Sequence, residues 1–356
     1  MFFCWARLWE PWLSPGRNRI DMSDADYAMM STRGQVAVMR RHAAEFLSLW
    51  GIRNVSLKLV NHGFNTTFRV DWGGRSAALR INVNSIRSEA QIRAETAWTS
   101  ALADWGQVPV PRPIPMRDGG HVATRDWEGT PHPLRAVLYE WLPGHNFSKG
   151  ITPAVCRSLG RATRLLHEHG RGFELPDGAE LAQFDDPTFG ANVLIGHDYV
   201  QDQGVLERTR QANLPILARL NEKQCMPVHF DLHFWNLRQT SNGLGVLDFD
   251  DCLMGKPVLD VMVTLYYLRR VEAFHGRQLE AAYWDGLGLE VEDLEVSSQE
   301  LETLIAGRAY LLANDFLRNV TPDVVAMGPK YLRATEIRLR EFEKTGVFRP
   351  FNVEES

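Results

Sequence analysis

The hydrophobic pattern of this 356-residue chain shifts in character near Gly144. Before that point, short segments that alternate like strands follow and flank two helical segments, and after it apolar residues recur mostly with the helical period. The pattern predicts an α+β chain with a small sheet-rich N-terminal lobe and a larger helical C-terminal lobe. The predicted strands are 55–60, 67–72, 76–82, 135–142, a short strand ending at Phe230, and 243–251. The predicted helices are about 36–50, 88–104, 152–169, 201–220, 258–271, 275–285, 298–319 and 329–345.

The segments between these elements suggest where the lobes meet. Residues 109–115, "PVPRPIP", are predicted to form an extended connector without ladder donors, because proline has no N–H. The strand 135–142 ends at Pro143-Gly144 and serves as the predicted hinge. We therefore expect an N-terminal lobe over 23–142, a C-terminal lobe over 143–346, and a tail over 347–356.

Residues 1–22 are rich in aromatic residues but carry no helical pattern. Arg7, Glu10 and Pro11 interrupt the apolar run, which argues against a secretory signal. We expect a disordered leader, or an upstream start that the working protein does not use, with translation beginning at Met22. A membrane-surface tag is the alternative.

The overall composition limits the kinds of binding partner to be expected. The net charge of −5 and the isoelectric point near 6.1 give no electrostatic reason to expect nucleic acid or an anionic membrane. No apolar run approaches the roughly 20 residues that span a bilayer. The four cysteines are scattered without metal-binding spacing, which is typical of free thiols in a reducing compartment. These features predict a cytoplasmic protein.

The densest polar group in an apolar frame is the segment 228–237, "VHFDLHFWNL". Asp231 and Asn236 are five residues apart, and Asp248 follows twelve residues later in "VLDFDD". Asn242-Gly243 is a strong hairpin signal, so the intervening chain should fold Asp248 back beside Asn236. An amide and a carboxylate oxygen would then share a divalent cation, with a second carboxylate close by.

Phosphoryl transfer needs such a set of residues. Its transition state is loose, so the protein mainly positions groups and neutralises charge. Mg²⁺ prefers oxygen ligands and keeps some waters, which suits Asn236, Asp248 and the phosphates of ATP. Asp231 suits the general base that accepts the proton of a hydroxyl. Asp250 is a further candidate metal ligand, next to Asp251.

The N-terminal lobe offers nucleotide-binding candidates. The strand–loop–strand "LVNHGFNTTFRV" contains Gly63, which lets backbone approach phosphates, and Asn65 and Thr66 follow it. Arg80 lies in an apolar strand, where a charged group needs a partner, and Glu95 on the next helix is the natural one. The adenine edge is expected at the hinge, at Glu140, Trp141 and Leu142.

With these motifs the chain resembles the aminoglycoside phosphotransferase-type kinases over about residues 35–320. That group also contains choline kinases, homoserine kinases and a bacterial stress-response protein kinase. The motifs are "HGFNTTFRV", "AALRIN", "AETAWTSAL", "VPVPRPIP", "LYEWLPG", "LGRATRLLHEH", "VHFDLHFWNL" and "VLDFDDC…PVLDVMVTL". The resemblance implies a protein-kinase-like two-lobe fold, ATP and Mg²⁺ as cofactors, and a hydroxyl-bearing small molecule, or a protein Ser or Thr, as acceptor.

The resemblance also implies residue roles. It makes Asp231 the base, Asn236 and Asp248 the magnesium ligands, and Arg80 the equivalent of a phosphate-binding lysine paired with Glu95. Asp260 resembles the buried aspartate that steadies the catalytic loop. The chain departs from the family where Phe230 replaces the usual glycine before the aspartate, and where Trp235 replaces a small residue before the asparagine.

Other interpretations stay open. A catalytically weak nucleotide-binding regulatory protein is the alternative that Phe230 and Trp235 suggest. A metal-dependent hydrolase is the alternative that His229 and His233 suggest, with Asp248, Asp250 and Asp251 completing its site. Alternatively, His229 holds the loop by bonding backbone, while His233 lies near the acceptor. Asp315, in "LLANDF", is either a buried hydrogen-bonded residue or part of the acceptor pocket. The sequence leaves the acceptor itself unidentified.

Overall fold

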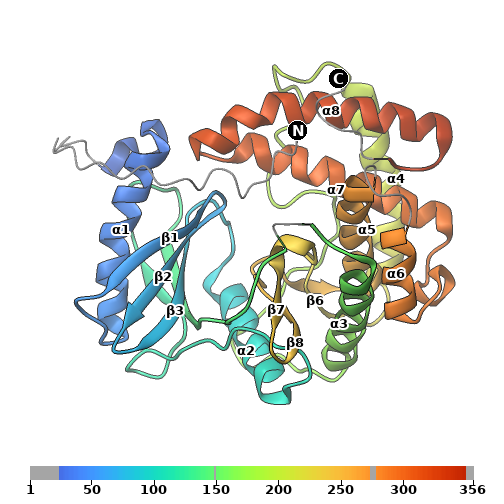
Figure 1. The fold of residues 1–356 in the computed structure, drawn as a ribbon. Helices are drawn as coiled ribbons and strands as arrows, with labels where there is room; N and C mark the ends of the chain where they lie inside the picture. The colour runs from blue at the N-terminus through green and yellow to red at the C-terminus, as the bar shows by residue number, and fades with distance from the viewer. Residues whose placement is uncertain (1–23, 148–149, 273–277, 350–356) are drawn as a thin grey trace.

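The computed structural model describes residues 24–147, 150–272 and 278–349. The expectations for residues 1–22, and most of the expected tail over 347–356, lie outside these ranges. A sheet-rich lobe stands on one side of the molecule and a larger helical lobe on the other (Figure 1). The two-lobe α+β architecture predicted from the change in hydrophobic period is therefore confirmed.

The N-terminal lobe is a five-stranded antiparallel sheet in the order β1-β2-β3-β5-β4. Phe68, Leu79 and Leu138 point from the sheet into a core shared with Phe46 and Leu47 of the first long helix. Apolar residues alternate along β2 and β3, which places one face of each strand in this core. The elements are η2 (Asp24–Met29), α1 (Thr32–Leu49), β1 (Ser56–His62), β2 (Asn65–Trp72), β3 (Arg75–Asn82), α2 (Glu89–Trp105), β4 (Ala123–Arg125) and β5 (Leu134–Glu140).

Helix α2 is fixed at both ends by local sequence. Ser88 and Gln91 form a capping box at its N-terminus, and Gly106 ends it in the left-handed conformation with φ 71°. Glu95 lies on the buried side of this helix. The caps therefore determine where the Glu95 carboxylate enters the lobe.

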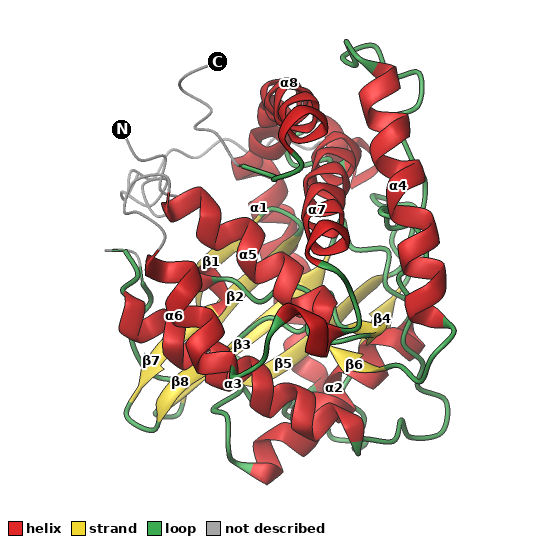
Figure 2. Cartoon of the chain, turned by 90° about the vertical axis from the view of Figure 1, so that its right-hand side faces the viewer, coloured by secondary structure: helices red, strands yellow, loops and turns green. Residues whose placement is uncertain are grey.

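The C-terminal lobe is mostly helical, with two small antiparallel sheets. Thr152 caps α3 and Pro153 occupies its first turn, as predicted. Helices α5, α7 and α8 lie together in this lobe, as the view in Figure 2 shows. The elements are α3 (Pro153–Arg171), α4 (Gln203–Asn221), β6 (Met226–Val228), η3 (Phe234–Asn236), β7 (Leu237–Thr240), β8 (Gly243–Val246), β9 (Leu253–Gly255), α5 (Val258–Glu272), α6 (Gln278–Leu287), η4 (Val291–Leu294), α7 (Ser298–Arg318) and α8 (Pro322–Thr345).

Two local predictions need correction. Helix α8 begins at Pro322 rather than near 329, and Pro329 lies inside it. Tertiary packing of Val324, Tyr331 and Leu332 against the core outweighs the tendency of an internal proline to break a helix. The connector 109–115 is extended as predicted, but Ile114 donates its N–H to Leu138 O at 2.7 Å, so it does join the edge of the sheet.

The hinge runs from β5 into the second lobe at the β7–β8 hairpin. His145 N donates to Gln239 O at 3.0 Å, and Gln239 N donates to His145 O at 2.8 Å. The end of the hinge is thus tied to the hairpin that leads to Asp248. None of the helices in the described ranges is long and apolar enough to cross a membrane.

Candidate active site between the lobes

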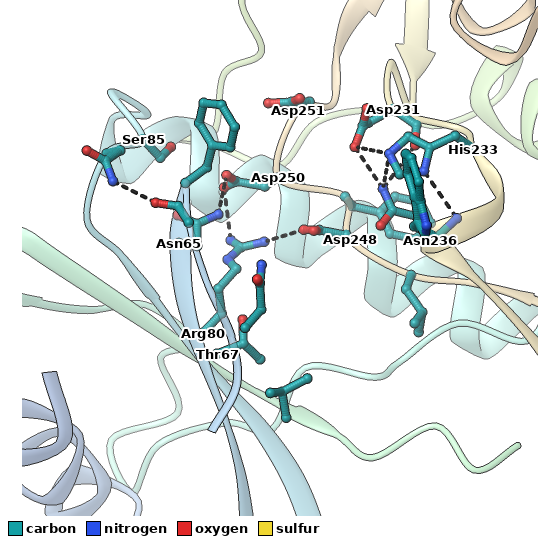
Figure 3. A pocket seen from close by; sticks show the side chains of 18 of the residues that line it. Asn65, Thr67, Arg80, Ser85, Asp231, His233, Asn236, Asp248, Asp250 and Asp251 are labelled. Atoms are coloured by element: carbon teal, nitrogen blue, oxygen red, sulfur yellow. Dashed lines mark hydrogen bonds and ion pairs between the residues drawn. The ribbon is translucent and has the colours of Figure 1, made fainter. Parts of the chain in front are cut away.

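A cavity of about 1210 Å³ lies between the lobes and is lined by residues of both. Arg80 from β3 enters it from one side, and Asp231 and Asn236 enter from the other, with Asp248 between them (Figure 3). The predicted site residues from distant parts of the sequence therefore meet in one place.

A buried aspartate holds the loop that carries Asp231. Asp260 accepts the N–H of Phe230 at 2.6 Å and that of His229 at 3.3 Å, and His167 Nε2 lies 2.9 Å from it. His229 is fully buried and donates from Nε2 to Leu247 O at 2.9 Å. These contacts are those expected if Asp260 and His229 stabilise the loop. The imidazole of His229 therefore has a structural role.

The carboxylate of Asp231 is held by three donors. Arg308 Nη2 donates to Oδ1 at 2.6 Å, while Asn236 Nδ2 and His233 Nε2 donate to Oδ2 at 2.8 and 3.1 Å. Burial opposes ionisation of Asp231, but His233 and Arg308 outweigh it and hold the pKa of this carboxyl below its usual range. Asp231 is therefore ionised and fixed in orientation.

The β7–β8 hairpin brings Asp248 back beside Asn236, as predicted. Leu237 pairs with Val246, and Leu247 N donates to Asn236 O at 2.8 Å. The tight turn is Ser241-Asn242 rather than Asn242-Gly243, because Gly243 already pairs with Thr240. Hairpin length and pairing together determine the distance between the two candidate metal ligands.

Asp248 lies in the cavity with Arg80 as its cationic neighbour. It stands at φ +60°, its side chain is 47% exposed, and Arg80 Nη1 lies 3.8 Å away. Loss of hydration in the cleft raises its pKa to about 7, with repulsion from Asp250 and Asp231 adding to the effect and Arg80 opposing it. A divalent cation at this point would favour the ionised form.

Arg80 and Glu95 form the ion pair expected between β3 and α2. Arg80 Nη1 and Nη2 donate to the two carboxylate oxygens of Glu95 at 2.7 and 2.6 Å, and Tyr139 OH also donates to Glu95. Both charged side chains are almost fully buried. The bidentate geometry fixes the guanidinium at the wall of the cavity.

Asp250 is engaged by the N-terminal lobe. Asn65 Nδ2 donates to one of its oxygens at 2.7 Å and Asn82 Nδ2 to the other at 3.0 Å, with Arg80 Nη2 at 3.3 Å. Burial raises the pKa of Asp250, but Arg80 and Asn65 outweigh it and lower that pKa overall. Both oxygens therefore already have protein partners, and the metal-ligand role expected for Asp250 stays a prediction.

Of the remaining predicted nucleotide-binding residues, all but one line the cavity. Gly63, Glu140, Trp141 and Leu142 line the cavity, together with Asn65. Thr66 does not: its buried hydroxyl bonds His62 Nδ1 at 2.8 Å, and its neighbour on the other face of β2, Thr67, lines the cavity. Because side chains alternate along a strand, a shift of one residue exchanges the two faces.

Arg308 is the site residue that sequence reasoning missed. It lies on α7, is 2% exposed, and stacks its guanidinium over the rings of Phe230 and Tyr267 at 5.5 and 5.9 Å. The signal that singled out Arg80 was also present here, since Arg308 is a charged residue within an apolar helix.

The hydrolase interpretation gains no support from the geometry. His229 bonds backbone and His233 bonds Asp231, so neither imidazole faces a shared metal position. In the described part of the chain, no group of three or more His, Cys, Asp or Glu side chains could hold a metal ion.

A small antiparallel lobe, a helical lobe and an ion-paired arginine above an Asp–Asn–Asp cluster define the protein-kinase-like class of phosphotransferases. The model of the "Phosphotransferase enzyme family" matches residues 56–294, more than half of the chain. The chain belongs to this family, as its motifs predicted.

One relative and several solved structures are similar to this chain, and the solved structures share its fold. An uncharacterised protein of Deinococcus radiodurans is 30% identical over 272 residues, which cover 73% of this chain and 76% of that protein. The fold is similar to that of a microcompartment-associated aminopropanol kinase, with TM-score 0.67, 22% identity, and 87% and 99% of the two chains covered. An amicoumacin kinase in complex with AMP-PNP and Ca²⁺ matches with TM-score 0.63, 18% identity, and 90% and 96% covered.

Proposed function

We propose that this protein is an ATP- and Mg²⁺-dependent kinase that transfers the γ-phosphoryl group to a hydroxyl of a small molecule. The observation that carries the proposal is the meeting of Asp231, Asn236 and Asp248 in one cavity, opposite the buried Arg80–Glu95 pair. Family membership supplies the reaction class, and the side-chain arrangement supports the individual roles.

Asp231 serves as the base in this proposal. The acceptor oxygen forms its bond to phosphorus as the bond to the ADP oxygen breaks, and the hydroxyl proton passes to the Asp231 carboxylate. Three donors hold that carboxylate, so its orientation is set before the acceptor arrives. A weakly basic carboxylate suffices because in a loose transition state the proton moves late.

Asn236 and Asp248 would hold the metal ion. The amide nitrogen of Asn236 donates to Asp231, which leaves its amide oxygen for a cation, and the Asp248 carboxylate lies in the same cavity. Two hard oxygen ligands fit Mg²⁺, which takes its other ligands from phosphates and water. Bound there, Mg²⁺ would neutralise charge on the nucleotide phosphates. In this proposal Asp250 positions Arg80 and Asn65 rather than binding metal.

The N-terminal lobe binds the nucleotide in this proposal. Arg80 contacts phosphate oxygens, the turn at Gly63 covers them, and Glu140 to Leu142 contact the base. Nucleotide use is supported by the AMP-PNP in the similar amicoumacin kinase and the ADP in a spectinomycin phosphotransferase of similar fold, with TM-score 0.53, 14% identity, and 88% and 96% of the two chains covered. These same names support a small molecule as acceptor.

Asp231→Asn tests the base assignment. The substitution keeps the size of the side chain and should lower phosphoryl transfer by roughly 10²–10⁴-fold. Release of ADP in a screen of hydroxyl compounds measures turnover, and thermal stabilisation by AMP-PNP with Mg²⁺ measures binding. We expect binding to stay within about threefold of wild type. Wild-type turnover in Asp231→Asn would exclude Asp231 as the base.

A further inference from the structure

The cavity extends from Asp231 along the helical lobe. Tyr267 of α5 packs its ring on His233 with centroids 4.3 Å apart. Arg270 follows by three residues and so lies on the same helix face, about one turn further on. Tyr331 and Lys330 of α8 line the same cavity, and Arg270 opposes the raised pKa of the buried Tyr331. This end of the cavity is where an acceptor would lie.

The carboxylates at this end already have arginine partners. The pairs are Asp231 with Arg308 at 2.6 Å, Asp251 with Arg87 at 3.4 Å, and Asp315 with Arg318 at 3.7 Å. Each of these carboxyl groups therefore already has an arginine partner within the protein.

Two cations that line the same cavity, Arg270 and Lys330, have no such partner in the described ranges. Arg270 is half-buried and Lys330 is exposed, and neither forms an ion pair with any residue in the described ranges. The preceding residue, Arg269, shows the contrast, because it donates to both Glu280 and Glu302. The chain pairs the arginine that faces the core and leaves unpaired the one that faces the cavity.

We propose that the acceptor carries an anionic group, a carboxylate or a phosphate, which Arg270 and Lys330 bind while its hydroxyl faces Asp231. This inference rests on the proposed kinase function and names the class of its acceptor. Two cations from different helices can grip the oxygens of one anion, and the arginine offers a planar fork of donors.

The neighbouring wall sets the character of the rest of the acceptor. Leu312 and Phe316 of α7 and Met327 of α8 also line the cavity. Because these side chains are apolar, polar groups of an acceptor would be bound by Asp231 and by the two cations. An acceptor with a hydroxyl at one end and an anionic group at the other matches this distribution.

The binding test uses four small compounds whose carbon skeletons have the same length but whose charges differ. Glycerate and glycerol 3-phosphate are anionic, glycerol is neutral, and 1-amino-2-propanol is cationic. Each is titrated calorimetrically into the full chain saturated with AMP-PNP and Mg²⁺, so that the nucleotide half is filled. We expect at least one anionic compound to bind tenfold or more tightly than glycerol. Equal binding of all four, or tightest binding of the amine, would overturn the inference.

Substitutions test whether Arg270 and Lys330 cause the preference for anionic compounds. Arg270→Gln combined with Lys330→Gln should abolish the anionic preference, while Arg270→Lys should keep most of it. Lys344→Gln is the control, because this exposed lysine also lies on α8 but pairs with Glu341 outside the cavity. Unchanged anion binding in the double variant would also overturn the inference.

Turnover measurements distinguish a failure of this inference from a failure of the proposed kinase function. Hydroxy acids and phosphorylated alcohols should give a kcat/KM at least tenfold above neutral and amino alcohols, and the double variant should raise KM for the acceptor but not for ATP. Failure of AMP-PNP to bind counts against the kinase function itself. Turnover that prefers neutral or amino alcohols keeps the kinase function and removes the anionic acceptor.

Discussion

Phe230 shows how one residue can depart from a family pattern and keep the fold. Its φ is +62°, a region that favours glycine, which explains the usual glycine at this position in the family that the motifs resemble. The ring packs against Phe184 and Phe189 at 4.6 and 5.5 Å, and the guanidinium of Arg308 lies over it. The packing of a buried ring offsets the backbone strain.

Phe230→Gly should therefore destabilise the protein despite relieving strain. The glycine removes about 1–2 kcal/mol of left-handed strain, but loss of a buried aromatic ring costs about 3–5 kcal/mol. We expect the free energy of unfolding to fall by about 2 kcal/mol, measured by urea denaturation. Asn54→Gly is the control, because Asn54 has φ +53° on the exposed surface and should change stability by less than about 0.5 kcal/mol. A more stable Phe230→Gly variant would contradict the packing argument.

Asp315 gives the protein a pH-dependent stability. Burial raises its pKa to about 7, repulsion from Asp251 adds to this, and Arg318 and Arg308 oppose it. The native state therefore holds a proton that the unfolded state releases near pH 4, so this group's contribution to stability declines as pH rises from about 4 to 7.

Asp315→Asn should flatten this dependence. The difference in unfolding free energy between pH 5 and pH 8 should change by at least about 1 kcal/mol relative to wild type, in favour of the variant at pH 8. Denaturant unfolding at the two pH values measures it, with Asp104→Asn on the exposed surface as control. An identical pH profile in Asp315→Asn and wild type would exclude Asp315 as the source.

At the residue level, the sequence predicted those contacts of the site that depend on short spacing along the chain. Asp231, Asn236 and Asp248 lie within eighteen residues and one hairpin, so their meeting follows from local structure. Arg308 is 77 residues from Asp231, and only the packing of α7 against the catalytic loop brings the two together. Helical periodicity carries no information about such a pairing.

At the scale of elements, the contact between hinge and hairpin depends on Gly144. Its φ is +134°, and a Cβ added there would lie 2.3 Å from the carbonyl oxygen of Gln239. Because this part of the hinge pairs with β7, any shift would be passed to the hairpin that orients Asp248.

Gly144→Ala should thus reduce both stability and nucleotide binding. We expect a loss of about 3 kcal/mol in unfolding free energy from strain and clash together. AMP-PNP affinity should fall several-fold, measured by calorimetry. Gly119→Ala is the matched control, because Gly119 has φ +90° but open space around it, so that variant carries strain without the clash. Equal effects of the two substitutions would show that hinge contact is unimportant.

Most elements followed from periodicity and caps, while others depended on tertiary packing. Thr152-Pro153 and Ser88 mark helix starts by local chemistry, so sequence placed α3 and α2 within a residue or two. The start of α8 at Pro322 was predicted about seven residues too late, and the three-residue strand β4 is too short to give a periodic signal.

At the scale of the whole molecule, several contacts join the lobes. They include the hinge, the hydrogen bonds of Asn65 and Asn82 to Asp250, and the corner between α7 and α8, where Thr321 Oγ1 donates to Gly63 O at 2.8 Å. Asn84 Nδ2 donates to the same carbonyl at 2.8 Å, and Val320 N donates to Asn84 Oδ1 at 3.1 Å. The turn expected to cover the phosphates is therefore tied directly to the helices expected to hold the acceptor.

The account depends most on a cation shared by nucleotide and protein in the cavity between the lobes. Calorimetric titration of AMP-PNP, with Mg²⁺ and with EDTA, tests it on wild type, Asp248→Asn and Asp231→Asn. The account predicts that wild type binds at least tenfold more tightly with Mg²⁺, that Asp248→Asn erases this difference, and that Asp231→Asn keeps it. An Asp248→Asn variant with the full wild-type dependence on Mg²⁺, or a wild-type chain that binds no nucleotide, would contradict the account.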